Sequence, residues 1–106
     1  MTAQSMTINN LEAQNRFFKG TGGTSSENRD LGFVPAFLDR ETGVVYRSCR
    51  ADGSPSPIHL MDGLPEALVV ARNTTGGVYA VKGSVVAGFI RNGRFYTREQ
   101  AARTLR

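Results

Sequence analysis

The sequence predicts a small α+β domain rich in β-structure: a single small antiparallel sheet or a partly open SH3-like barrel of about five to six strands, with a C-terminal helix. The chain has 106 residues, which is room for one domain. Apolar residues make up 40% of the chain, enough to form a hydrophobic core. The 12 glycines and 4 prolines stand mostly between short apolar runs, a spacing typical of short strands joined by tight turns.

Residues 1–30 are predicted to be a flexible N-terminal arm, and residues 31–106 a single β-rich domain. The arm is polar and rich in Gly, Ser, Thr and Asn, so it offers few apolar side chains for packing. Between residues 6 and 18 a weak amphipathic pattern has helical spacing, with Asn9 or Asn10 as its cap. The pattern leaves open whether this stretch forms a helix.

The first predicted hairpin joins two apolar runs through Arg40–Gly43. Gly43 takes the left-handed position of this loop, and Asp39 can bond to the amides of the turn. Because Pro35 cannot donate a hydrogen bond, its strand is expected at an edge of the sheet or at a bulge.

Two more hairpins are predicted further along. A strand over residues 67–72, with or without one helical turn before it, pairs with "VYAV" at residues 78–81. The dipeptide Asn92–Gly93 is the strongest hairpin signal in the chain, and as a two-residue turn it places Ile90 opposite Phe95.

The chain is predicted to end in a short helix that runs to Leu105. Its start is the capping box Thr97–Gln100, in which the first and last side chains bond to each other's backbone. Glu99 and Arg103 have the i,i+4 spacing of a helical ion pair.

The last hairpin also carries the candidate binding face. The turn places Arg91 opposite Arg94, and alternation puts Phe89 and Tyr96 on the same side of the sheet. Arginines beside aromatic rings are suited to phosphate contact and stacking. The alternative is that the arginines extend into water and that Phe89 or Tyr96 belongs to the core. The residues expected to bind are Phe89, Arg91, Arg94, Tyr96 and Arg98.

The stretch "RFFKGTGGTSSENR", residues 16–29, contains the ingredients of a phosphate-binding loop but not its order. In such a loop the glycines precede a lysine at a helix start, whereas Lys19 precedes the glycines here. A flexible linker is therefore the favoured interpretation, although glycine amides can also gather around an anion.

Catalysis and metal binding are not predicted. Cys49 and His59 are the only cysteine and histidine, too few for a closed zinc site. A Cys–His dyad would need them within hydrogen-bond reach, whereas a histidine between Ile58 and Leu60 is more often part of the core. The sequence thus predicts no enzyme activity, no catalytic residue, no metal and no cofactor.

The net charge of +4 and a pI near 9.8 favour acidic partners. Lys19 and Lys82 are the only lysines, so most of the positive charge is carried by arginine, which suits forked recognition of carboxylate or phosphate. The N-terminal sequence has no signal-peptide pattern, and no apolar run is long enough to span a bilayer. A cytoplasmic protein without a membrane partner is expected, and its oligomeric state is open.

The runs "FVPAFLDRETGVVYRS", "ADGSPSPIHLMDGLP" and "VVAGFIRNGRFYTREQAA" resemble a set of small proteobacterial proteins often carried on mobile or accessory elements. The resemblance covers most of residues 16–103. That set has no established activity, so the resemblance implies an accessory-genome origin and assigns no functional residue.

The function predicted from these observations is a non-catalytic binding module with a basic, arginine-rich surface that engages another protein. The first alternative is a nucleic-acid-binding protein that uses the face of Arg91, Arg94, Tyr96 and Arg98. The second, prompted by the resemblance alone, is a mobile-element-encoded inhibitor of a host defence complex.

Overall fold

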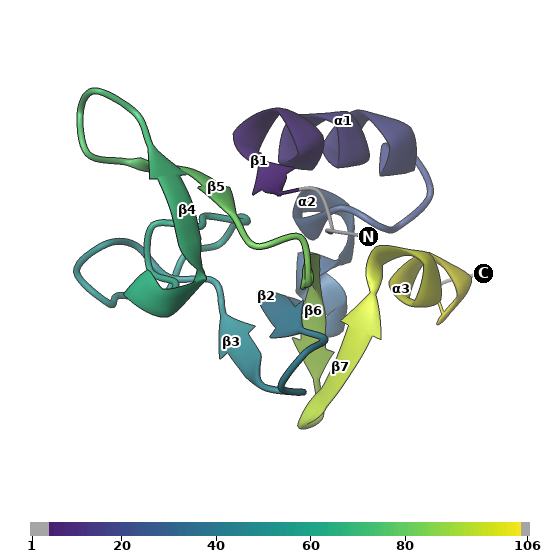
Figure 1. Ribbon diagram of the computed structural model, residues 1–106. Coiled ribbons are helices and arrows are strands. Elements are labelled where there is room, and N and C mark those ends of the chain that lie inside the picture. The colour runs from purple at the N-terminus through teal and green to yellow at the C-terminus, as the bar shows by residue number, and fades with distance from the viewer. Residues whose placement is uncertain (1–4, 105–106) are drawn as a thin grey trace.

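The computed structural model describes residues 5–104 and has an α+β fold with two small antiparallel sheets (Figure 1). In chain order the elements are β1 (Met6–Thr7), α1 (Ile8–Phe18), α2 (Ser25–Asn28), the 3₁₀ helix η1 (Arg29–Leu31), β2 (Val34–Asp39), β3 (Val45–Arg47), the 3₁₀ helix η2 (Glu66–Leu68), β4 (Val69–Arg72), β5 (Val78–Val81), β6 (Val85–Arg91), β7 (Arg94–Thr97) and α3 (Arg98–Thr104). The predicted β-rich α+β class and the C-terminal helix are confirmed. Within the described residues, no helix has both the length and the apolar character needed to cross a membrane.

The strands form two sheets, so the prediction of a single sheet is wrong. Their orders are β1-β5-β4 and β3-β2-β6-β7. The chain passes from one sheet to the other between β5 and β6, where the amide of Val85 donates to the carbonyl oxygen of Lys82 (3.1 Å). Across residues 5–104 no strand pair joins the two sheets, so they do not close into a barrel.

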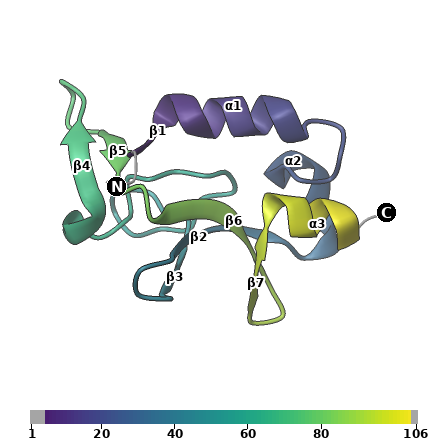
Figure 2. The ribbon, with the colours of Figure 1, turned by 45° about the vertical axis from the view of Figure 1, so that its right-hand side comes forward.

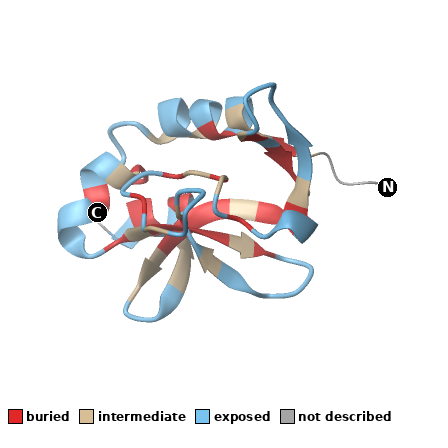
Figure 3. Cartoon of the chain, turned by 90° about the vertical axis from the view of Figure 1, so that its left-hand side faces the viewer, coloured by how far each residue is buried: buried red, intermediate tan, exposed pale blue. Residues whose placement is uncertain are grey.

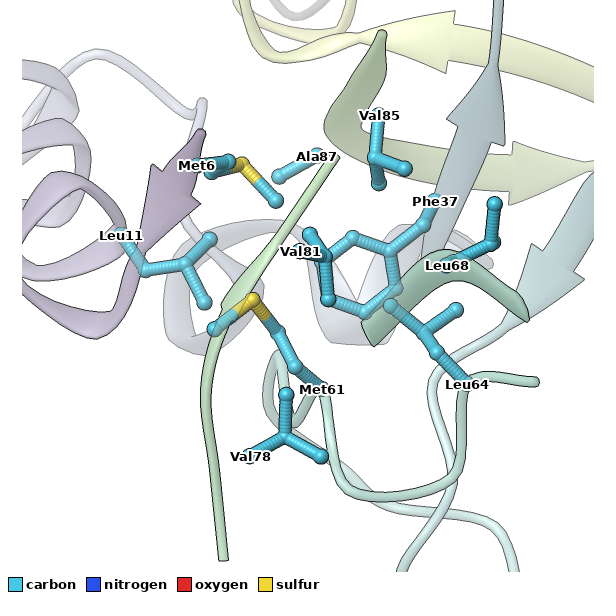
Figure 4. Close-up of a cluster of buried hydrophobic side chains, with 10 residues drawn as sticks. All are labelled: Met6, Leu11, Phe37, Met61, Leu64, Leu68, Val78, Val81, Val85 and Ala87. Atoms are coloured by element: carbon cyan, nitrogen blue, oxygen red, sulfur yellow. The ribbon is translucent and has the colours of Figure 1, made fainter. Parts of the chain in front are cut away.

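The larger hydrophobic core lies between the two sheets and α1 (Figures 1 and 4). The ring of Phe37, from β2, is fully buried in it and lies among side chains from the other sheet and the segment before β4 (Figure 4). The buried members are Met6, Leu11, Phe37, Met61, Leu64, Leu68, Val78, Val81, Val85 and Ala87. A smaller core under α3 contains Phe33, Phe89 and Ala101. Figure 3 shows that burial follows the central strands and that the hairpin ends are exposed.

The segment predicted to be an arm is packed on the domain from residue 5 onward. Met6 pairs with Val81 of β5, which makes β1 an edge strand of the three-stranded sheet. Thr7 caps α1 through a capping box with Asn10, and Leu11 enters the larger core. Residues 6–18 therefore include a helix, and the boundary of the packed domain does not fall at residue 30. The mobility of the arm in solution stays a prediction.

Pro35 lies in an inner strand, so its predicted place at a sheet edge is wrong. β2 has β3 on one side and β6 on the other. The carbonyl oxygen of Pro35 accepts from the amide of Ser48 (2.9 Å). Residues paired in this way in an antiparallel ladder normally exchange two hydrogen bonds, so the Pro35 nitrogen, which carries no hydrogen, faces the carbonyl oxygen of Ser48. The carbonyl oxygen of Ser48 instead accepts from the amide of Ser56 (3.0 Å). The amide of Ser56 thus takes the place of the N–H group that Pro35 lacks, which explains why an inner strand tolerates this proline.

The predicted registers of the first and last hairpins are confirmed. Gly43 has φ +76, and the carboxylate of Asp39 accepts from the amide of Glu41 (3.0 Å). Asn92 and Gly93 have φ values of 54 and 75, as a two-residue turn with two left-handed positions requires.

The strand predicted from residue 67 begins at Val69, after the single turn of η2. The capping box of α3 forms through Thr97 and Gln100, and Arg103 pairs with Glu99. The predicted end of this helix at Leu105 lies outside the described residues.

Gly88 permits a close approach of β7 to β6. A Cβ atom on Gly88 would lie 2.3 Å from the carbonyl oxygen of Tyr96 and 2.4 Å from Cζ of Phe95. The ring of Phe95 therefore lies across the sheet over the space where a side chain would otherwise be.

Leu11→Ala should lower the free energy of unfolding by about 2–4 kcal/mol, because Leu11 is buried in the larger core. Phe17→Ala is the control on the same helix, since the Phe17 side chain is 78% exposed and its loss should cost below about 0.5 kcal/mol. Urea unfolding measures both. A Leu11→Ala variant that unfolds like the parent would restore the interpretation of residues 1–30 as a flexible arm.

Gly88→Ala should destabilise the fold by about 1–3 kcal/mol or more, since the added methyl group would overlap backbone as well as a ring. Gly77→Ala is the matched control, because the nearest atoms there are 3.3 Å away and belong to the Asn73 side chain. Thermal unfolding of the two variants should separate clearly. Equal melting temperatures would mean that β6 and β7 pair in a different register.

Candidate binding surface

The five residues predicted to bind lie at different depths in the fold. The register confirms that Arg91 lies opposite Arg94 and Phe89 opposite Tyr96. Phe89 is fully buried and Arg98 is 3% exposed, so neither is available to a macromolecular partner in this structure. Tyr96 and Arg91 are half-buried, and Arg94 is exposed. A binding role for the three accessible residues stays a prediction.

The two opposed arginines of the hairpin take different surroundings. The guanidinium carbon of Arg91 lies 4.9 Å from the ring centroid of Phe33, a cation–π distance. Arg94 shares a hollow of about 380 Å³ with Tyr96 and Arg103. Within residues 5–104 neither Arg91 nor Arg94 forms an ion pair. Contact with Phe33, rather than a carboxylate, therefore accommodates the charge of Arg91.

Arg98 points into the interior and joins segments that are distant in the sequence. Its Nη1 donates to the carbonyl oxygen of Gly23 (3.1 Å), and its Nη2 lies 3.2 Å from Nδ1 of His59. Its guanidinium carbon is 5.9 Å from the ring centroid of Phe89. Burial lowers the pKa of Arg98 to about 10, so the group stays protonated at neutral pH. Arg98 is thus a buried cation without a carboxylate partner in the described part of the chain.

His59 is the polar partner of this cation and is itself part of the core. Its ring centroid lies 5.4 Å from that of Phe37 and 5.2 Å from that of Phe89. Nε2 donates to the carbonyl oxygen of Gly88 (2.7 Å), because a carbonyl can only accept, and Nδ1 accepts from Arg98. Burial, followed by the positive charge of Arg98, lowers the pKa of His59 to about 4. The imidazole is therefore neutral at physiological pH.

The Cys49–His59 dyad that the sequence allowed does not form here. Both ring nitrogens of His59 are engaged with other groups, and Cys49 is a partly buried thiol. In the described range, no group of three His, Cys, Asp or Glu residues is placed to hold a metal ion. The interpretation of His59 as a core histidine is confirmed.

The glycine loop surrounds an anion, and this anion is a side chain of the protein. The amides of Gly20 and Gly22 and the hydroxyl of Thr24 donate to the carboxylate of Glu27. The hydrogen bond from Thr24, followed by those from the amides of Gly20 and Gly22, lowers the pKa of Glu27. Nδ2 of the buried Asn28 donates to the carbonyl oxygen of Gly22 (2.9 Å). The loop is therefore held by its own side chains, and its amides are occupied by Glu27.

A basic hollow that the sequence did not indicate lies where η1, β2, β3 and the loop after β3 meet. We call it the arginine pocket and define it by Arg29, Arg47, Pro35, Pro55 and Pro57. Its volume is about 340 Å³, and no carboxylate is among its lining residues. Both arginines are exposed. Nη2 of Arg29 lies 3.5 Å from the carbonyl oxygen of Pro57, so this side chain extends from η1 toward the loop.

The sequence does not predict the arginine pocket because its residues come from three separate segments. Arg29 belongs to the predicted arm, Arg47 ends a predicted strand, and Pro55 and Pro57 lie in a predicted turn. Single arginines at these positions have no spacing that distinguishes them from solvated surface charges. They come together only because η1, β3 and the loop after β3 all lie beside the start of β2.

Comparison of the chain with protein-family models, curated proteins and solved structures finds no match. The mobile-element origin implied by the resemblance therefore stays a hypothesis. Function has to be inferred from the geometry and charges of the chain itself.

Acid should destabilise the protein through His59. Its pKa is about 4 in the fold against 6.5 ordinarily, so the unfolded chain takes up the proton first. The stabilisation is complete above about pH 6.5, is lost as the pH falls toward 4, and does not change further below that value. A depression of this size corresponds to roughly 3 kcal/mol.

His59→Gln tests this, because glutamine can donate to Gly88 and accept from Arg98 but does not titrate. Urea unfolding across this pH range should show a smaller loss of stability for the variant than for the parent. The same pH dependence in both proteins would show that His59 is not held neutral in the fold.

Proposed function

We propose that this protein is a non-catalytic binding module that engages another protein through its basic surface, with the arginine pocket as the contact site. The observation that carries the proposal is a pair of exposed arginines, Arg29 and Arg47, on a proline-walled hollow without a lining carboxylate. Proline and arginine side chains together offer an apolar wall and fixed hydrogen-bond donors. A short acidic segment of a partner protein fits that chemistry.

The distribution of acidic side chains supports an external partner. Those engaged in ion pairs or hydrogen bonds elsewhere are Glu27, Asp39, Glu41, Asp52, Asp62, Glu66 and Glu99. In residues 5–104 neither Arg29 nor Arg47 forms an ion pair. A guanidinium binds a carboxylate through two parallel hydrogen bonds, so an Asp or Glu of the partner would supply what this chain does not.

The location of the pocket favours an extended ligand. β3, which carries Arg47, is an outer strand of the four-stranded sheet. Edge strands present backbone groups with which an added peptide strand can pair. A segment lying beside β3 can therefore place its carboxylates near Arg47 and Arg29.

Nucleic-acid binding is the second candidate, because Arg94, Tyr96 and Arg103 share one hollow. The aromatic rings that would stack on bases are less available, since Phe89 is fully buried and Arg91 lies over Phe33. Binding of single strands relies on such stacking as well as on phosphate contacts. We therefore rank a protein partner above nucleic acid.

An inhibitor of a host defence complex would be one kind of protein that acts in this way. This more specific proposal depends on the resemblance to proteins of mobile elements. The proposal that the protein works in the cytoplasm rests instead on its single cysteine, Cys49, which is typical of a reducing compartment. The arginine pocket is compatible with it, since docking on a partner is all that such an inhibitor requires.

Arg29→Ser combined with Arg47→Ser should weaken the binding of a short polyglutamate peptide about tenfold or more, because both forked donors are lost. The matched control is Arg16→Ser with Arg40→Ser, which removes the same charge from α1 and the first hairpin, at exposed residues that do not line the pocket. The control should change the affinity about twofold or less, since charges outside the pocket are screened at an ionic strength of about 0.15 M. NMR titration at this ionic strength measures the affinity and shows which amides respond.

Equal losses in the two double variants would mean that net charge, and not the pocket, determines binding, and the proposal would fail. A thymidine oligonucleotide that binds more tightly than polyglutamate at the same salt, and loses affinity in Arg94→Ser, would support the nucleic-acid candidate instead.

A further inference from the structure

One face of the four-stranded sheet belongs to neither hydrophobic core. Side chains alternate along each strand, and the register therefore assigns every residue to one of two faces. Phe37 and Ala87 point into the larger core, and Phe89 points into the smaller one. We call the opposite side the open sheet face, and define it by Val34, Leu38, Val45, Val86, Ile90 and Phe95.

The open sheet face is apolar and partly exposed to solvent. Val45 is 38% exposed, and the other five members are half-buried without joining either core. Figure 2 shows α1 and α2 on one side of β6, whereas the β2–β3 and β6–β7 hairpins extend on the other side. Accessible apolar side chains that gather on one face of a sheet are typical of an interaction site.

The middle of the face holds small residues. Ala36 pairs with Gly88 between two rows of larger side chains, and Phe95 lies across Gly88. Both Ala36 and Gly88 are buried, so the outer rows carry the accessible apolar surface. These rows are Val34–Ile90–Phe95 and Val45–Leu38–Val86. Apolar side chains arranged on a sheet face suit packing against a sheet of another protein.

The charge at the margin of the face indicates what covers it. Arg47 is the only charged residue that the register places on this face, and it also lines the arginine pocket together with Val34. A second copy docking by the same face would bring a second Arg47 and no carboxylate, so self-association leaves this charge unpaired. A partner with an apolar surface and an acidic margin pairs it.

We propose that the partner protein that places a carboxylate in the arginine pocket also covers the open sheet face with apolar side chains. This inference rests on the proposed function. Nine of the described residues line the pocket, whereas a specific interface uses roughly 20–30 residues per partner. The adjoining sheet face supplies further contact residues.

Two defined peptides test the inference. One carries glutamates at one end followed by alternating valine and threonine, and the other has serine in place of each valine. Both have the same charge. The valine peptide should bind the parent about tenfold more tightly, since its apolar side chains are removed from water. In NMR titrations it should shift the amides of the open sheet face, whereas the serine peptide should shift only those around Arg29 and Arg47.

The double variant Val45→Thr plus Val86→Thr keeps the branched shape of both side chains and removes apolar surface. It should bind the serine peptide like the parent and lose most of the advantage of the valine peptide. Val70→Thr is the control on the other sheet, at a residue that is 55% exposed, and should retain that advantage.

Equal affinity of the parent for both peptides would overturn the inference and leave the proposed function in place. Absence of binding by either peptide at low salt would overturn both. A parent dimer in analytical ultracentrifugation that becomes monomeric in the Val45→Thr plus Val86→Thr variant would identify a second copy as the occupant, and would also overturn the inference.

Discussion

Arg98 begins the C-terminal helix, yet its guanidinium lies in the interior, where it contacts Gly23, His59 and Phe89. A buried cation is unfavourable unless polar groups replace the water it loses. Here a carbonyl oxygen and a neutral imidazole accept hydrogen bonds from the guanidinium and an aromatic ring lies beside it, and each comes from a different part of the chain. The position of Arg98 at the start of α3 adds to the free-energy cost of burying its charge, because the helix dipole disfavours a cation there. The glycine loop, the segment through His59 and α3 are consequently held together by one side chain.

This arrangement determines which surfaces remain for binding. The side of the last hairpin that carries Phe89 is closed by Phe33, Tyr96 and α3, which form the smaller core. Residues on that side stabilise the fold, and only those near the hairpin end reach solvent. Among residues 5–104, the larger apolar side chains on the opposite side of the sheet belong to neither core, so the apolar alternation of β2 and β6 continues on a surface that solvent partly reaches.

Charged side chains divide in the same way, into those that stabilise the fold and those that remain exposed without a partner in the described residues. Most carboxylates stabilise the chain locally: Asp39 bonds within its turn, Glu27 orders the glycine loop, and Glu99 pairs along α3. Arg29 and Arg47 have no such local partner in the described residues. In the proposed binding mode the positive charge used for recognition is that of Arg29 and Arg47, which the fold brings to one hollow, and not that of the hairpin pair that stands out in the sequence.

Features that depend on a few neighbouring residues were determined by the sequence alone. Asn92 and Gly93 accept left-handed dihedral angles, so the register of the last hairpin follows from the turn. Thr97 and Gln100 satisfy amides within one helical turn, and Gly43 closes the first hairpin. Pro35 shows the limit of such rules, because the missing donor that indicated an edge strand is replaced by Ser56, far along the chain.

Tertiary structure decided the rest, for a physical reason. The split into two sheets, the packing of α1, the burial of Arg98 and the arginine pocket all depend on segments distant in sequence that close around one another. Arginine in the first turn of a helix ordinarily extends into water, whereas here the carbonyl oxygen of Gly23, 75 residues earlier, and the side chains of His59 and Phe89 hold it inside. Local preferences therefore set the elements and their turns, whereas burial and the shape of the binding surface follow from long-range packing.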